Sequence, residues 1–575
     1  MADQLVLAIV PIVTQAIQSC FQCYSFYTDT KRFHFDAHTL LWKFRLQEAR
    51  LKAWAKKWGI LVDNYAGNET HDIANNPWDE EDLKFVLETF GRIETLLNDY
   101  QKINDKYELM LSTEDAVGEL VKTNSMKVED ILDNGAFLDH YRKDQELLAK
   151  RKRDNGMIKR IKWVASDRAK LEGIVQNLKA YNDGLDHLLS TKARRMAKQA
   201  LAPELIQQAH SLEDLAELES ATSGQTIVLQ DAVALRKHFL KISNLDSKDK
   251  PEDTMAGSIA SLRLPLSSFI NVRESQASRG SSNPRSLAVM ISTSSGVPAS
   301  TIIEWRTFAL DIPTAVQTAV TTRIKYLAQF LSVPEVASAC VPRCLGYIED
   351  DENSRIGLVF ECRTPLSASL TTTQEDCISL YRLIARKNKN FLGDRFKLAS
   401  WLASSLSILH TAGWLHKGLR SNNILFSMGD IARLTNPKLL GFEYSRPNSA
   451  YAFSSLLIFS NHEVDLYRHP RVQGSGRERF TKADDIYALG IILLEIGFWR
   501  PISELWHKGY KTAEEFRLIL CSNYIPQLGS KVGKIYMEVV EWCIDGQETG
   551  DGNGQTGTQN DFFWSVVNPL ATLVA

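Results

Sequence analysis

The stretch His416-Lys-Gly-Leu-Arg-Ser-Asn-Asn423 is the most informative part of this 575-residue chain. A long helical pattern, Trp401 to His416, leads into it, and the apolar run Ile424-Leu-Phe426 leads out of it. Short apolar runs of this kind are typical of buried strands. The pattern therefore predicts a helix that passes through a polar loop into a strand.

Strand patterns precede this loop, and helical patterns surround and follow it. Ser286–Ser292 and Ser300–Phe308 are β-branched or alternating runs, and Ile356–Glu361 is typical of a short buried strand. Long helical patterns return from Phe391 onward. This order predicts an α+β region with a small sheet-rich lobe and a larger helical lobe.

The first third of the chain has helical periodicity instead. Its clearest pattern has apolar residues along one side of a helix: Leu40, Phe44, Leu51, Trp54 and Trp58. Further such segments predict an all-α bundle. We expect a multidomain chain with a helical bundle at residues 1–195, a linker at 196–285 containing a short helix near Asp231 to Ile242, and an α+β domain at 286–575.

Composition narrows the class of protein. The chain has 44% hydrophobic and 24% charged residues and a net charge of −2, which is typical of a globular protein and does not favour nucleic acid as a partner. The scattered cysteines are typical of reduced thiols in a cytoplasmic protein. They are Cys20, Cys23, Cys340, Cys344, Cys362, Cys377, Cys521 and Cys543. Cys20 and Cys23 have the spacing of a redox or zinc pair, but no second pair follows them and they lie within an apolar helical pattern, so core packing is favoured over metal binding.

Two segments are candidates for membrane contact. The apolar N-terminal segment from Leu5 to Tyr24 has the length of a spanning helix, but glutamines interrupt it, so it predicts either a conditional membrane segment or a buried bundle helix. Its membrane-insertion candidates are Leu5, Ile9, Ile12, Val13 and Ile17. The basic run is the second candidate, because cations attract anionic lipids. Its residues are Lys150, Arg151, Lys152 and Arg153, which also fit a solvated helix end or a nuclear-import signal.

Residues 286–575 resemble a protein kinase in the order of their landmarks. The loop at His416–Asn423 is similar to a catalytic loop, Gly441 falls where a metal-binding aspartate belongs, and Asp485–Glu495 resembles the start of the central helix of the large lobe. Tyr467–Arg471 stands where the Ala-Pro-Glu segment belongs. The resemblance implies a bilobal kinase-like fold.

The residues that phosphoryl transfer requires are absent from this pattern. Gly418 and Gly441 occupy the positions of two essential aspartates, and either Glu304 or Arg306 replaces the phosphate-binding lysine. Ser292–Pro298 lacks the repeated glycines of a phosphate loop. The helix predicted from Thr314 to Phe330 offers no glutamate to pair with such a lysine.

Four positions correspond to kinase landmarks in a degenerate form: His416, Gly418, Asn423 and Gly441. This pattern predicts that the chain has no catalytic residue, no metal and no tightly bound cofactor. Asn423 and Arg306 remain as candidates for, at most, weak and metal-independent ATP binding. The expected result is a pseudokinase, which is not an enzyme. The alternative is an atypical Ser/Thr kinase that binds ATP.

Residues 1–195 resemble the fungal HeLo domain, the prion-inhibition and propagation domain. The resemblance rests on Leu7 to Cys23, Leu41 to Gly59, and Ile161 to Gly184. It implies a membrane-targeting module of programmed cell death or heterokaryon incompatibility. A helical bundle before a pseudokinase is also similar to the mixed-lineage-kinase-like executors of necrotic death.

The combined resemblance implies a pseudokinase that restrains or releases a HeLo module. On activation by an unknown partner protein, such a module would form a homo-oligomer and move from the cytoplasm to lipids of the plasma membrane. The alternative is a soluble signalling scaffold that has no membrane activity.

Overall fold

We analysed a computed structural model of the chain. It describes residues 38–57, 82, 85–86, 88–93, 96, 168–207, 209, 211–222, 232–237, 240, 260–274, 285–291, 298–308, 312–332, 341–361, 377–387, 390–447, 462–474, 478–507, 509–545 and 559–573. Contacts divide the chain into two units. Unit 1 comprises 1–201 and 208–230, and unit 2 comprises 202–207 and 231–575.

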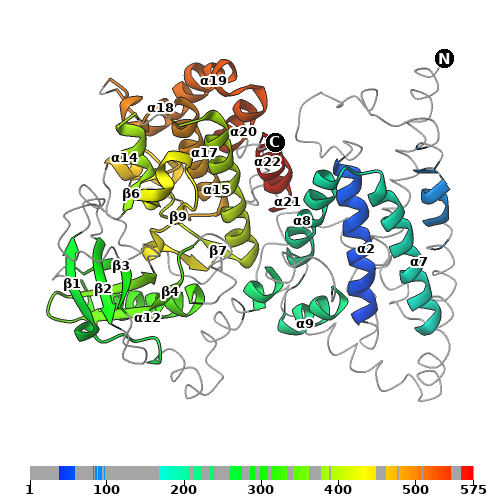
Figure 1. Cartoon of the computed structure of the whole chain (residues 1–575), viewed down its shortest axis with the longest axis horizontal. Helices are drawn as coiled ribbons and strands as arrows, with labels where there is room; N and C mark the ends of the chain where they lie inside the picture. Colours follow the sequence, from blue (N-terminus) through cyan, green and yellow to red (C-terminus); the bar gives the residue numbers. More distant parts are fainter. Residues whose placement is uncertain are drawn as a thin grey trace, which may run out of the picture. The chain divides into compact units, whose positions relative to one another are not determined.

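Unit 1 is helical in the part that the structure describes. Its long helices are α2 (His38–Lys57), α7 (Arg168–His187) and the part of α8 (Thr191–Gln207) up to residue 201, followed by the shorter α9 (Leu212–Ala221). Helix α2 packs against both α7 and α9 (Figure 1). The predicted apolar side of α2 is confirmed, because Leu40, Phe44, Leu51 and Trp54 are all buried there.

Buried aromatic rings supply much of the core of unit 1. Trp42, Phe44 and Trp54 of α2 are at most 1% exposed, and Phe90 contacts Trp54 at a ring-centroid distance of 5.9 Å. Full burial of a side chain of this kind stabilises a fold by about 1.5–3 kcal/mol. The Trp54 indole also donates a 2.8 Å hydrogen bond to the carbonyl oxygen of Leu185, which joins α2 to the end of α7.

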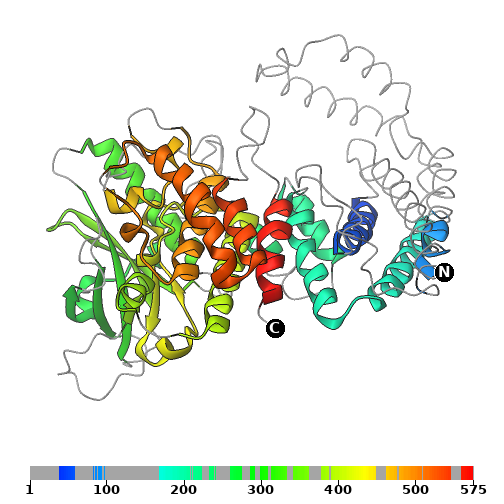
Figure 2. The ribbon, with the colours of Figure 1, turned by 90° about the horizontal axis from the view of Figure 1, so that it is seen from above.

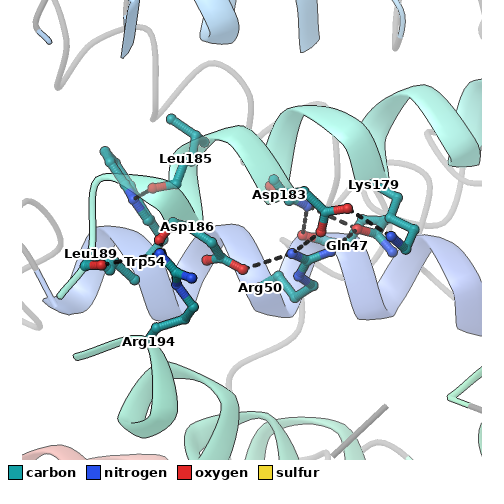
Figure 3. A network of polar contacts seen from close by, with 10 residues as sticks. Gln47, Arg50, Trp54, Lys179, Asp183, Leu185, Asp186, Leu189 and Arg194 are labelled. Atoms are coloured by element: carbon teal, nitrogen blue, oxygen red, sulfur yellow. Dashed lines mark hydrogen bonds and ion pairs between the residues drawn. The ribbon is translucent and has the colours of Figure 1, made fainter. Parts of the chain in front are cut away.

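A polar network centred on Arg50 joins the same two helices (Figure 3). The buried Arg50 guanidinium donates to Asp183 at 2.6 Å and to Asp186 at 2.7 Å, and also to Gln47 at 3.3 Å. Burial raises the pKa of the Asp183 carboxyl, but hydrogen bonds from Lys179 and Arg50 lower it by more, so the net pKa lies below the usual value. The carboxylate is therefore ionised at neutral pH.

We predict that Arg50→Met lowers the free energy of unfolding of unit 1 by about 3 kcal/mol, because two carboxylates lose their buried partner. The matched variant Lys179→Met removes a partner of Asp183 that is half exposed, and it should cost less than about 1 kcal/mol. Hydrogen exchange of the α7 amides in the full-length protein measures both. Equal loss of protection in the two variants would contradict the assignment of Arg50.

The network also predicts a pH dependence. A carboxyl whose folded-state pKa is depressed contributes stability above its unfolded pKa, and this contribution is lost as the pH falls through the folded value. The contacts between α2 and α7 should therefore weaken below about pH 4, and they should weaken less in Asp183→Asn, which has no carboxyl to titrate.

Unit 2 begins with a five-stranded antiparallel sheet in the order β1-β2-β3-β5-β4. The strands are β1 (Phe269–Glu274), β2 (Arg285–Ile291), β3 (Pro298–Thr307), β4 (Cys344–Asp350) and β5 (Arg355–Glu361). Helix α12 (Thr314–Leu331) packs on β4 and β5. Together they form one end of unit 2 (Figure 2).

The central strand β3 is buried along most of its length, with side chains that alternate between two environments. Ile303 and Trp305 join an apolar cluster with Val359 on one face of the sheet. Successive strand residues point to opposite faces, so Glu304 and Arg306 share the other face. That face supplies polar groups to the helical part of unit 2.

The helical part of unit 2 is built around α15 (Leu392–Ala412) and α17 (Lys482–Phe498) (Figure 1). These helices pack on each other, and α17 also packs on α19 and α20. The other helices are α14 (Leu380–Ala385), α16 (His462–Asp465), α18 (Ala513–Ile519), α19 (Ile525–Val532), α20 (Lys534–Ile544), α21 (Gln559–Phe562) and α22 (Asn568–Leu573). The predicted small sheet-rich part and larger helical part are both present.

The range predicted as a linker, 196–285, contains regular elements. It contains α9, which Ser211 and Asp214 begin with reciprocal side-chain to backbone hydrogen bonds, and it contains the edge strand β1. Leu215 and Leu218 of α9 are fully buried. The short helix predicted near Asp231 is present at residues 232–237. Short elements of this kind depend on packing against neighbours, and their own patterns are weak.

Candidate functional site

The loop 416–423 lies between two elements that fix its ends. Helix α15 ends at Gly413, whose φ of 93° closes the helix in the left-handed conformation that glycine favours. Strands β7 (Trp414–Leu415) and β8 (Ile424–Ser427) then flank the loop, as the helix–loop–strand pattern predicted. Strand β8 pairs with β6 (Cys377–Ser379) and β9 (Lys438–Leu439), so the loop is anchored on a second small sheet.

Asp485 holds the first half of the loop. It lies in the first turn of α17, and its carboxylate accepts the backbone N–H groups of His416 at 2.7 Å and Lys417 at 2.8 Å. The His410 ring nitrogen Nε2 lies 3.1 Å from the same carboxylate. Burial lowers the pKa of His410 despite this carboxylate, so the ring is neutral at pH 7. Asp485 therefore fixes the backbone at the start of the loop.

The centre of the site is an ion pair between β2 and β3. Arg285 and Glu304 are directly opposite each other in the register of the two strands. The Arg285 Nη2 and Nε atoms lie 2.7 and 2.8 Å from Glu304 Oε1, and both side chains are at most 5% exposed. Opposite charges in a cross-strand pair stabilise a sheet, and this pair is also screened from water.

The same two side chains reach the helical part of unit 2. The Glu304 carboxylate accepts the backbone N–H of Gly441 at 2.8 and 3.0 Å and that of Phe442 at 3.3 Å. Arg285 donates to Asn423 Oδ1 at 2.6 Å and to the Asn422 carbonyl at 3.2 Å. The sheet is therefore joined to the loop 416–423 and to the segment at Gly441 by charge-assisted hydrogen bonds.

Glycines at 418 and 441 allow the backbone to approach closely at this point. A Cβ atom added to Gly418 would lie 2.4 Å from the Gly441 carbonyl oxygen, and one added to Gly441 would lie 2.1 Å from Asn423 Nδ2. Gly441 also has a φ of 94°, which side-chain-bearing residues rarely adopt. Neither position accepts an aspartate in this conformation.

Arg306 lies two residues further along the same face of β3. Its Nη1 atom donates a 2.6 Å hydrogen bond to the Tyr444 hydroxyl, and its guanidinium lies 4.6 Å from the centre of the Tyr444 ring. Glu304 therefore binds the backbone at Gly441 and Phe442, whereas Arg306 binds Tyr444. Which of the two stands in for a phosphate-binding lysine stays a prediction.

The site residues expected from the sequence are only partly brought together. Asn423 is fully buried, accepts from Arg285 and donates to the Gly418 carbonyl at 2.6 Å. His416 is 1% exposed, and its Nδ1 accepts the Gly418 N–H at 3.2 Å. Asn423 is thus bound within the protein, and Arg306 lies with Tyr444, so the two candidates for nucleotide binding have separate partners.

The segment compared with a phosphate loop, Ser292–Pro298, leads from β2 into β3. The preceding hairpin of the sheet joins β1 to β2 across residues 275–284. Residues 275–284 and 292–297 lie outside the described part of the chain.

The membrane-contact candidates are also outside the described residues. This applies to Leu5, Ile9, Ile12, Val13 and Ile17, and to Lys150, Arg151, Lys152 and Arg153. Within the described residues, no helix combines the length and apolarity needed to cross a bilayer. The same residues contain no group of three or more His, Cys, Asp or Glu side chains arranged to hold a metal ion.

Two functional residues were not predicted from the sequence. Arg285 was overlooked because its significance depends on the strand register that places it opposite Glu304. Lys417 lies in the loop 416–423, where it is 6% exposed and has a φ of 62°. Neither property can be predicted from the sequence of the loop. A buried lysine in the left-handed conformation is rare enough to indicate a special role.

Comparison with known families assigns the N-terminal part of the chain. The family model described as HeLo, prion-inhibition and propagation, matches residues 5–218. This region carries a HeLo domain, and it extends through most of α9, well past the boundary of 195 expected from the sequence. No curated protein matches the chain. The chain therefore carries a HeLo domain at residues 5–218, and its C-terminal region combines helices with antiparallel sheets.

Proposed function

We propose that this protein is a conditional membrane-targeting HeLo module controlled by a catalytically inactive, kinase-like unit. The family match supports the first part, because the HeLo description is that of a prion-related, cell-death type of module. The geometry at Glu304 supports the second. The activating partner, the homo-oligomer and the relocation from the cytoplasm to the plasma membrane belong to the same proposal.

One observation supports the proposal that unit 2 is catalytically inactive. The Glu304 carboxylate, paired with Arg285, lies between the sheet and the segment at Gly441. Phosphoryl transfer requires a cation on the phosphates and carboxylates that hold magnesium. The side chain that reaches Gly441 from β3 is instead the anion Glu304, and its charge is balanced by Arg285. A phosphate brought there would meet a carboxylate, and like charges at close range repel.

The same geometry argues against an atypical kinase. A general base contributes about 10²–10⁴ to a rate, and no aspartate fits at 418 or 441 in this backbone. Asn423, the remaining metal-ligand type of side chain, is already bound by Arg285 and Gly418. The kinase-like unit therefore acts through binding and conformation.

Membrane activity is the part of the proposal that distinguishes an executor from a soluble scaffold. We predict that full-length protein, once activated in cells, kills them, and that deletion of Leu5–Val13 abolishes killing because the apolar segment is the inserting element. Release of a dye from vesicles of anionic lipid measures the step directly.

The matched control removes charge without touching the apolar segment. Neutralising the run Lys150–Arg153 to glutamines should weaken recruitment to anionic vesicles by about 1 kcal/mol per lysine or arginine while leaving insertion intact. Killing and dye release that persist at full strength after deletion of Leu5–Val13 would contradict the executor model and favour the scaffold.

A further inference from the structure

A second polar site lies beside the loop 416–423. It is a cavity of about 20 Å³ lined by Lys417, Arg420, Tyr444, Arg468, Phe480 and Asp485, among others. A volume of this size holds a water molecule or a small added group, and not a nucleotide. The Lys417 amine is the chemically reactive group in the cavity wall.

The Lys417 side chain is buried, and the two carboxylates in the cavity lining, Asp484 and Asp485, are bound to other groups. It is 6% exposed, and its Nζ atom has no hydrogen-bond partner among the residues that the structure describes. The nearby carboxylate of Asp485 is already bound to two loop amides and lies close to His410. The Lys417 Nζ atom lies 5.4 Å from the centre of the Phe480 ring, whose face gives a cation only modest stabilisation.

Several guanidinium groups act electrostatically on the Lys417 amine. The charges that act on Lys417 are those of Arg446, Arg323 and Arg468, which oppose its protonation, and of Asp485, which favours it. Arg446 is fully buried, and the buried Nε and Nη2 atoms of Arg323 have no acceptor among the described residues. Burial, together with these cations, lowers the pKa of Lys417 to about 7.

We propose that the Lys417 Nζ atom is a carbamylation site, which adds carbon dioxide to form a carbamate whose negative charge is balanced by Arg323 and Arg446. The amine lone pair forms the new N–C bond, one C=O π pair moves onto oxygen, and one N–H proton leaves to solvent. The neutral amine and carbon dioxide thus give one carbamate anion and one proton, and no oxidant or reductant is required.

Conversion of the lysine to a carbamate would replace an unfavourable buried cation by an anion that the guanidinium groups attract. A buried cation beside other cations is unfavourable, whereas a buried anion among guanidinium groups forms charge-assisted hydrogen bonds. The new oxygens would also supply acceptors to Arg323. The site is independent of the proposed membrane function, since it involves unit 2 residues alone.

The test uses full-length protein in buffer containing ¹³C-bicarbonate at pH 7, followed by alkylation with a trialkyloxonium salt that traps carbamates as esters. Mass spectrometry of the digest locates the adduct. The internal control is Lys482, which is also largely buried and whose pKa is lowered to about 8. The neutral fraction alone favours Lys417 by about fivefold, and stabilisation by the guanidinium groups should widen the difference.

Two arginine variants separate a built site from a merely neutral amine. Arg323→Gln should lower the occupancy of the Lys417 adduct severalfold, whereas Arg395→Gln, which removes another partly buried guanidinium near Trp499, should leave it unchanged. The signal should disappear in Lys417→Arg. An unmodified Lys417 in folded wild-type protein, or equal labelling of Lys417 and Lys482, would overturn the proposal.

Discussion

Glu304→Gln is expected to lower the free energy of unfolding of unit 2 by about 3 kcal/mol, the lower end of the range for breaking one side of a buried ion pair. The cost arises because the Arg285 charge stays buried while its carboxylate is lost. Arg285 keeps its bonds to Asn423 and Asn422, which limits the loss. Chemical denaturation of the full-length protein, followed by tryptophan fluorescence, measures it.

The double variant Arg285→Met/Glu304→Leu is the informative control. Removing both charges together leaves no uncompensated ion, so it should be at least about 1 kcal/mol more stable than Glu304→Gln. A second control, Asp350→Asn, breaks an ion pair with Arg355 whose guanidinium is one quarter exposed and which lies within a single hairpin. If Asp350→Asn and Glu304→Gln lower the free energy of unfolding equally, the ion pair at Glu304 stabilises unit 2 no more than an ordinary ion pair within a hairpin.

Hydrogen exchange distinguishes the bridge from ordinary packing. The amides of Gly441 and Phe442 donate to the Glu304 carboxylate, so Glu304→Gln should raise their exchange rates selectively. The Lys417 amide, which Asp485 binds, should remain protected. This pattern would show that the sheet and the segment at Gly441 are held together through Glu304.

Restoring an aspartate at position 441 is the second large effect. Gly441→Asp should destabilise unit 2 by about 3 kcal/mol, the sum of about 1–2 kcal/mol for a left-handed residue and about 1–3 kcal/mol for overpacking. The added Cβ atom would meet Asn423 Nδ2, and the new carboxylate would face Glu304. Phosphoryl transfer should not return, because Glu304 still neutralises Arg285 and repels a phosphate.

Gly474→Asp isolates the conformational part of that cost. Gly474 has a φ of 68°, but a Cβ atom there would meet nothing within 4 Å. This variant should therefore lose only the 1–2 kcal/mol of the dihedral term. If Gly441→Asp is as stable as the wild type, the backbone at 441 adapts and the two glycines do not exclude aspartates.

Much of the fold followed from periodicity within single elements. Helix α2 was predicted because Leu40, Phe44 and Trp54 repeat at helical spacing, and β3 was predicted from its β-branched run. Strand β1 and helix α9 were missed because each is short and lies among polar residues. Strand β1 is stabilised by pairing with β2, and α9 is stabilised by packing on α2, which is distant in sequence.

The site was less predictable because its central contacts depend on register. Glu304 and Arg306 share one face of β3, so alternation alone could not decide which of them binds the backbone at Gly441. Arg285 becomes significant only when β2 and β3 are aligned and Asn423 is brought to the same place. The glycines at 418 and 441, by contrast, were singled out by the order of residues along the chain, because the resemblance to a kinase places aspartates there.

Nucleotide binding is the most direct test of the claim that unit 2 acts without catalysis. Isothermal titration of the full-length protein with ATP and Mg²⁺ should give no saturable heat, and the rate of phosphate release should equal that of buffer alone. The reason is that Arg285 is paired with Glu304, so neither side chain is available to bind phosphate or magnesium. Saturable binding that requires Mg²⁺, accompanied by turnover that Glu304→Gln abolishes, would contradict the account.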